Sequence, residues 1–134
     1  MADTVDVRVM FSSKRHYHVR LVNHSDGTGE SAVVKIDKST LTGPDGTEPG
    51  RIVIEEVTYS VNGFEGVKLL WDHNTDDEAL MLSGSGYYDF RPSAGLIDPA
   101  STGGTGDLLL TTVSTGAGAA GDSYDIYLIC RLKD

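Results

Sequence analysis

The amino-acid sequence predicts an all-β protein, an antiparallel β-sandwich of the jelly-roll type with about eight strands. Thr, Val and Ser are abundant beside 16 Gly residues, which favours strands and turns over helices. Apolar and polar residues alternate in several short segments, the period of a half-buried strand. Clusters of Gly, Pro and Asp separate these segments. No internal repeat of about 20 to 50 residues is visible, which disfavours a solenoid or a propeller.

Alternation predicts the first three strands. The segment 5–11 has Asp6 and Arg8 on one face and four apolar residues on the other: Val5, Val7, Val9 and Phe11. In the segment 16–21, one face of the predicted strand carries His16, His18 and Arg20, and the other carries three apolar residues: Tyr17, Val19 and Leu21. In segment 32–36, Ala32, Val34 and Ile36 alternate with Val33 and Lys35. Residues 25–29 contain Asp and Gly, which tolerate positive φ, so we expect a hairpin between the second and third strands.

Residues 38–50 form a predicted loop, because Pro and Gly interrupt any strand ladder there. A strand restarts at Arg51, and its apolar phase changes at the pair Glu55 and Glu56. Ile52 and Ile54 share one phase before this pair, and three apolar residues share the other phase after it: Val57, Tyr59 and Val61. One extra residue reverses the facing of everything that follows, so we expect a β-bulge at this pair. Two short strands with a bend are the alternative.

The second half of the chain contains shorter predicted strands. In segment 67–71 the residues Val67, Leu69 and Trp71 share a core-facing phase, and a polar turn at 72–78 separates it from a short run at 79–82. Residues 87–90 add another run. Residues 91–106 are rich in Pro, Gly and small residues without a period, which indicates a functional or docking loop. A strand at 108–113 and a Gly/Ala tip at 114–121 lead to the last strand, with five core-facing positions: Tyr124, Ile126, Leu128, Cys130 and Leu132.

Length and charge limit the domain organisation and the partners. A chain of 134 residues has the length of one domain, which we expect to span residues 1–134 with an N-terminal arm at 1–15. Its formal charge is −9, the wrong sign for neutralising phosphates or anionic lipid headgroups, so neither nucleic acid nor a membrane is an expected partner. The first residues lack the basic flank and apolar stretch of a secretory signal, so we expect maturation in the cytoplasm.

Two histidines form a weak metal-site candidate. His16 and His18 lie two residues apart on a predicted strand, so both side chains leave the same face and could bind one metal ion. This spacing in a jelly roll suggests a cupin. A cupin also needs a glutamate about four residues later, where Val22 and Asn23 stand, and a further histidine near the next hairpin, whereas no histidine follows His73 in this sequence. We therefore expect two histidines on a polar strand face or at a subunit contact, and no cofactor.

A second metal-site candidate lies in the acidic turn. Asp72, Asn74 and Asp76 alternate as oxygen ligands do in a calcium loop. An EF-hand needs glycine at the sixth position, where Asp77 stands, and glutamate at the twelfth, where Ser83 stands. We favour an acidic turn, with a calcium site of another geometry as the alternative.

No catalytic constellation is visible, so we do not expect an enzyme. Cys130 is the only thiol and lies in the core-facing phase of the last strand, where burial makes a thiol inert. Glu55 and Glu56 point to opposite faces of a strand and cannot flank one bond. Residues 27–32 fit G-x-G-x-x-A, but a strand and not a helix follows them, so no helix N-terminus would receive a pyrophosphate.

Exposed aromatic and basic residues are the candidates for an interface. Tyr87 and Tyr88 are adjacent, so at least one faces outward if the segment is extended. Trp71 shares the core-facing phase of its strand, so we expect it in the core instead of on a sugar-binding surface. The interface candidates are five residues: Tyr87, Tyr88, Arg91, Phe11 and Arg15.

Several blocks occur in a characteristic order. They are residues 22–30 (VNHSDGTGE), 32–37 (AVVKID), 69–72 (LLWD), 86–90 (GYYDF), 106–113 (GDLLLTTV) and 121–124 (GDSY). Together they resemble a family of small virion structural proteins of tailed bacteriophages, over most of the chain from Leu21 to Leu132. Residues 5–18, His24, His73 and the acidic stretch 76–78 depart from this pattern, which affects the partner surface more than the fold.

The resemblance implies a non-enzymatic particle component made in the cytoplasm of the host bacterium. It implies a capsid decoration or cement protein on the outer surface of the virion, where it would bind the major capsid protein and hold neighbouring subunits together. Such proteins are commonly trimers on threefold positions. A neck, tail or fibre subunit, or a virion module that binds host glycans, is the alternative.

Overall fold

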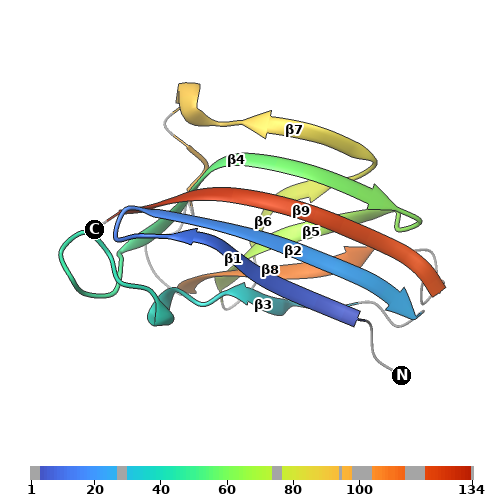
Figure 1. The fold of residues 1–134 in the computed structure, drawn as a ribbon, viewed down its shortest axis with the longest axis horizontal. Coiled ribbons are helices and arrows are strands. Elements are labelled where there is room, and N and C mark those ends of the chain that lie inside the picture. Colours follow the sequence, from blue (N-terminus) through green and yellow to red (C-terminus); the bar gives the residue numbers. More distant parts are fainter. Residues whose placement is uncertain are drawn as a thin grey trace.

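The computed structural model describes residues 4–26, 30–73, 77–93, 95–97, 104–113 and 120–133. Within these residues the chain forms nine strands and two short 3-10 helices, one strand more than the expected eight. They are β1 (Thr4–Ser12), β2 (His16–Asp26), β3 (Val33–Ile36), η1 (Lys38–Thr40), β4 (Arg51–Asn62), β5 (Gly66–His73), β6 (Asp77–Leu82), β7 (Ser85–Asp89), η2 (Arg91–Ser93), β8 (Gly104–Val113) and β9 (Ala120–Lys133). Two antiparallel sheets pack on each other (Figure 1), which confirms the all-β sandwich. In the described segments no helix has the length and apolar character needed to cross a bilayer.

The strand pairs are nested along the chain. One sheet has the order β1-β2-β9-β4-β7 and the other the order β3-β8-β5-β6. The pairs β2 with β9, β3 with β8, β4 with β7 and β5 with β6 follow one another inward, and they alternate between the two sheets. Two further pairings, β9 with β4 and β8 with β5, join these pairs within each sheet. The chain is thus a long hairpin that turns at β5 and β6 and is wrapped into two layers.

The predicted hairpin between the second and third strands is wrong. β2 and β3 lie in different sheets, and β3 pairs with β8. The Asp- and Gly-containing connection therefore leads from one sheet to the other; residues 27–29 of it lie outside the described residues. The facing of β3 also differs from strict alternation, because the register shifts between Val34 and Ile36. Lys35 and Ile36 are both buried, whereas Val33 and Val34 are exposed.

The β-bulge predicted in the fourth strand is confirmed. Ile54 lies opposite Cys130 and Glu56 opposite Ile129, so Glu55 is the extra residue. This insertion is why Ile54 and Val57 are both fully buried although they are three residues apart. β4 continues through the bulge from Arg51 to Asn62, so the alternative of two short strands is wrong.

The first strand differs from its prediction in two respects. β1 lies at the edge of the five-stranded sheet, and Val7 and Val9 are 40% and 48% exposed instead of half-buried in a core. A second bulge also interrupts it, because Val9 pairs with Val19 and Phe11 with His18, which leaves Met10 as the extra residue. Phe11 is therefore on the face of His18, opposite to the face of Val9. Of residues 1–15, expected as an N-terminal arm, residues 4–12 form this edge strand.

The core lies between the sheets. The five core-facing residues predicted in the last strand are all buried, and β9 runs through the middle of the five-stranded sheet. Val67, Leu69 and Trp71 of β5 are buried in the opposite sheet, as predicted. The segment after β7 continues along the edge of β4: Leu96 forms an isolated bridge with Ile54 and packs against the core, and a Cβ at Gly95 would lie 2.2 Å from Val53 Cγ1. Gly95 thus permits the close approach that buries Val53.

A buried polar cluster connects the two sheets. The ammonium group of Lys35 lies 2.6 Å from Glu30 Oε2, and these side chains are 1% and 5% exposed. Asn23 Nδ2 on β2 donates a hydrogen bond of 2.7 Å to Glu30 Oε1, and the Tyr124 hydroxyl on β9 donates to the same atom. The backbone of Glu30 is also bonded to Thr112 on β8. The Glu30 N–H donates a hydrogen bond to Thr112 Oγ1, and the Thr112 N–H donates one to the Glu30 carbonyl oxygen. Glu30 therefore holds both sheets together at one carboxylate.

Removing the buried cation should destabilise the fold strongly. Lys35→Met leaves the Glu30 carboxylate uncompensated in the interior, and we expect the free energy of unfolding to fall by about 3 to 5 kcal/mol. The double variant Glu30→Gln, Lys35→Met removes both charges and keeps an acceptor oxygen for Asn23 and Tyr124, so it should recover most of that loss. Urea unfolding of the three proteins measures these changes. A loss below about 1 kcal/mol for Lys35→Met would contradict the structural role of the ion pair.

Leu128 tests the phase of the last strand. This side chain is fully buried on β9, so Leu128→Ala should lower the free energy of unfolding by about 2 to 5 kcal/mol. Val34→Ala, at an exposed position of β3, is the control and should change it by less than about 0.5 kcal/mol. Equal effects of the two substitutions in thermal unfolding would show that the phase is wrong.

Candidate functional site

Three aromatic rings are stacked along the β7 edge of the five-stranded sheet. The ring centroids of Tyr59 and Tyr88, and of Tyr88 and Phe90, are each 5.7 Å apart, with interplanar angles of 20° and 16°. Gly86 makes room for this row, because a Cβ there would lie 2.8 Å from the Tyr59 hydroxyl. Tyr88 remains 40% exposed although it lies between two rings. The row is therefore a preformed apolar strip at the edge of the sheet.

The other face of β7 carries a polar network. Tyr87 is 54% exposed, and its hydroxyl donates a hydrogen bond to Glu56 Oε1, which raises the pKa of Tyr87. Arg91 Nε and Nη2 each donate a hydrogen bond of 2.9 Å to the Asp89 carboxylate, which lowers the pKa of Asp89. Arg91 Nη2 also lies 3.4 Å from Glu56 Oε1. We call the two faces together the β7 rim: Tyr59, Tyr87, Tyr88, Phe90, Arg91 and the two acids that hold them, Glu56 and Asp89.

The two histidines named as a weak metal-site candidate are neighbours, but their surroundings are aromatic. The ring centroids of His16 and His18 are 6.3 Å apart. The ring centroid of His18 also lies 5.3 Å from that of Phe11 and 6.4 Å from that of Tyr127. Among the described residues no group of three or more His, Cys, Asp or Glu side chains could hold a metal ion. Of the calcium candidates, Asp72 is half-buried near the end of β5, whereas Asn74 and Asp76 lie outside the described residues.

Two shallow pockets lie over the five-stranded sheet. One, of about 400 Å³, is lined by residues of β2, β4 and β9: Arg20, Thr58, Tyr59, Ser60, Asp125 and Tyr127. In it Arg20 Nε and Nη2 donate to the two oxygens of Asp125 at 3.0 and 2.7 Å. The other, of about 530 Å³, places Arg15 beside two further cations and is lined by Arg15, Pro44, Arg131, Leu132 and Lys133. Arg15 therefore lines this pocket, whereas Arg91 lies on the β7 rim.

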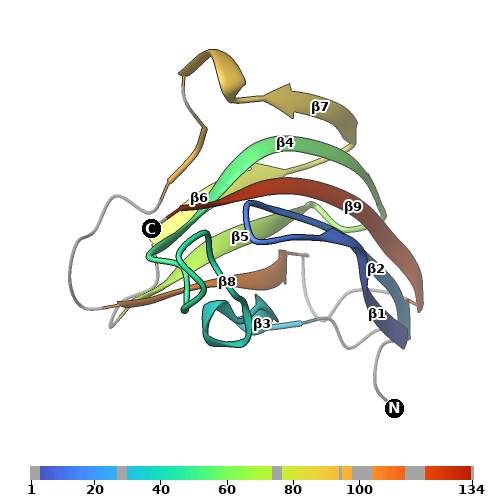
Figure 2. The same cartoon turned by 60° about the vertical axis from the view of Figure 1, so that its left-hand side comes forward.

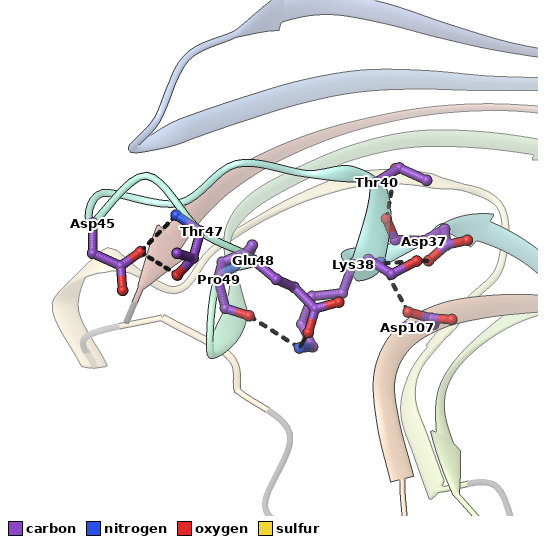
Figure 3. Close-up of polar contacts among 9 residues, drawn as sticks. Asp37, Lys38, Thr40, Asp45, Thr47, Glu48, Pro49 and Asp107 are labelled. Atoms are coloured by element: carbon purple, nitrogen blue, oxygen red, sulfur yellow. Dashed lines mark hydrogen bonds and ion pairs between the residues drawn. The ribbon is translucent and has the colours of Figure 1, made fainter.

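The loop that carries Pro44 is held by its own polar contacts (Figure 3). Asp45 Oδ1 accepts hydrogen bonds from the backbone N–H and hydroxyl of Thr47, at 3.0 and 2.8 Å. Lys38 Nζ lies 2.9 Å from Glu48 Oε2 and donates to the carbonyl of Pro49, while the backbone N–H of Lys38 donates to Asp107. The predicted loop 38–50 is confirmed, and these contacts fix it against β8.

Cys130 is a packing residue and not a nucleophile. It is fully buried on β9, and this burial raises the pKa of its thiol to about 12. A thiol that stays protonated and lacks access to solvent does not react at neutral pH. The prediction of structural packing at this position is therefore confirmed.

The sequence predicts only part of the β7 rim. Tyr87, Tyr88 and Arg91 were predicted as interface residues, and they lie together there. Phe11 and Arg15 do not join them, because they belong to the turn region of β1 and β2. Tyr59 and Glu56 were not predicted as site residues. Their contribution depends on the pairing of β4 with β7, which no local pattern in the sequence reveals.

Comparison with models of protein families, with curated proteins and with solved structures finds no match for this chain. Its function has to be inferred from its own residues.

The raised pKa of Cys130 predicts a pH effect. The folded protein keeps the thiol proton up to about pH 12, whereas the unfolded chain releases it near the ordinary value of 9.0. The contribution of the protonated thiol to stability is present below pH 9 and is lost as pH rises towards 12. The stability difference between wild type and Cys130→Ala, from urea unfolding, should therefore shrink above pH 9. A difference that is constant across this range would contradict the shift.

Proposed function

We propose that this protein is a non-enzymatic structural component of a tailed bacteriophage particle, a capsid decoration protein. In this role it binds the major capsid protein on the outer surface of the shell and stabilises the lattice. The β7 rim is the observation that supports this proposal most directly. It presents exposed tyrosines and an arginine on a preformed, hydrogen-bonded surface, and these residue types are enriched where proteins bind other proteins.

The strand order supports the same class of function. Nested pairs wrapped into two sheets are the arrangement of a jelly roll, so we infer that the sandwich is of this type. Jelly rolls occur in viral capsid domains and in lectins, and this support is an analogy of fold and not a property of the site. A repeating shell also suits a shallow contact surface, because many weak contacts add through effective concentration.

Binding to shells tests the proposal. Purified protein should sediment with DNA-free shells of the phage that encodes it. The double variant Tyr87→Ala, Arg91→Ala should weaken this binding by at least about tenfold, because both side chains project from the β7 rim. Tyr127→Ala removes a tyrosine from another part of the same sheet and should bind as wild type does.

Two results would count against the proposal. Failure of the wild-type protein to sediment with shells would overturn the decoration function. Wild-type binding by the double variant would show that the β7 rim is not the contact surface. Thermal unfolding of each variant separates loss of contact from loss of fold.

The pocket lined by residues of β2, β4 and β9 favours a second candidate function, adsorption to a host glycan. It combines the ring of Tyr127, the planar Arg20–Asp125 pair and two hydroxyl side chains, which are the kinds of groups that bind sugar rings. A glycan array tests it. Binding that Tyr127→Ala abolishes would support this function, and silence across the array would overturn it.

A further inference from the structure

β1 is an exposed edge strand with an apolar side. It pairs only with β2, and its outer edge has no strand beside it in the described part of the chain. Val7 and Val9 lie on the same face as the buried Leu21 and Val19 but beyond the cover of the second sheet. Val33 and Val34 on β3, the edge strand of that sheet, are also exposed, and β1 and β3 lie on the same side of the sandwich (Figures 1 and 2). An edge of this kind is a template for pairing with another strand.

The charges on β1 are self-complementary. Asp6 and Arg8 are exposed on either side of Val7. If β1 pairs antiparallel with β1 of a second copy and the pairing is centred on Val7, Asp6 lies opposite Arg8 of the second copy, and the same contact forms again by symmetry. Opposite charges directly across an antiparallel pair are stabilising. In this register odd-numbered residues pair with odd-numbered residues, and even-numbered with even-numbered. The backbone N–H and C=O groups that point away from β2 in one copy therefore meet those that point away from β2 in the other copy.

The same charges exclude the neighbouring registers. A shift of two residues in one direction places Asp6 opposite Asp6 of the second copy, and a shift in the other direction places Arg8 opposite Arg8. Like charges directly opposite each other are destabilising. The bulge at Met10 ends the regular part of the strand, so the paired stretch is centred close to Val7. Within one copy Arg8 lies opposite Arg20, whose guanidinium is already bonded to Asp125.

We propose that two copies of this chain associate through antiparallel pairing of their β1 strands, centred on Val7, so that their five-stranded sheets become one continuous sheet. The inference is independent of shell or glycan binding, because it uses the opposite edge of the sheet from the β7 rim. It replaces the trimer that the resemblance implies with a two-fold dimer.

Charge reversal at either position tests the register. Asp6→Arg gives each strand two positive charges and Arg8→Asp gives each two negative charges, so either variant alone should dissociate at least about tenfold more readily than wild type. An equimolar mixture of the two should form a heterodimer, because each arginine then lies opposite an aspartate. Light scattering over about 1 μM to 1 mM measures the masses, a range that includes weak dimers. Lys68→Asp, on β5 of the other sheet, is the charge-change control and should associate as wild type does.

The outcomes separate the proposal from its alternatives. A wild-type mass of two chains, with loss in each single variant and recovery in their mixture, supports β1 pairing. A mass of three chains, or a monomer at every concentration, would overturn it. A dimer that both single variants form as well as wild type would also overturn it, because association would then use another surface. Recovery in the mixture also shows that each variant is folded.

Discussion

The Glu30 carboxylate is the constraint on which the arrangement of the two sheets depends. It is buried, bonded to the Lys35 ammonium group from one sheet and to Asn23 and Tyr124 from the other. A buried charge is tolerated only when its partners are in place, so this contact fixes how β3 lies against β2 and β9. The register shift between Val34 and Ile36 buries both Lys35 and Ile36, so Lys35 reaches Glu30, whereas Val33 and Val34 before the shift are exposed at the edge of the sheet.

The unequal sheets leave apolar side chains exposed at both edges of the larger sheet. Five strands pack on four, so β1 and β7 extend the larger sheet at its two edges. Side chains on the inner face of these edge strands alternate as they do in the central strands, but the second sheet does not cover them. They are Val7 and Val9 at one edge and Tyr88 at the other. Exposed large apolar residues that gather at edges indicate contact surfaces. The two edges differ in chemistry, aliphatic with paired charges on β1 and aromatic with a hydrogen-bonded network on β7, which suits two different partners.

The sequence predicted those features that leave a visible change of phase. The bulge at Glu55 was predictable because two polar residues interrupt the alternation, whereas the bulge at Met10 lies within three consecutive apolar residues and leaves no mark. Asp and Gly after β2 predict a hairpin, whereas the chain crosses there to the other sheet. In the candidate site, adjacency predicts that at least one of Tyr87 and Tyr88 is exposed, and both are. The stacking of Tyr59 and the inward Lys35 depend on pairing across long sequence separations, which no local pattern specifies.

We propose that the two edges of the larger sheet are separate binding surfaces, β1 for a second copy and the β7 rim for the shell. Hydrogen–deuterium exchange tests it directly, because strand pairing and surface contact both protect backbone amides. Raising the concentration of the protein alone should slow exchange in β1, and adding shells should slow exchange in residues 85–91. Protection of both segments by the same partner, or of neither, would contradict the account.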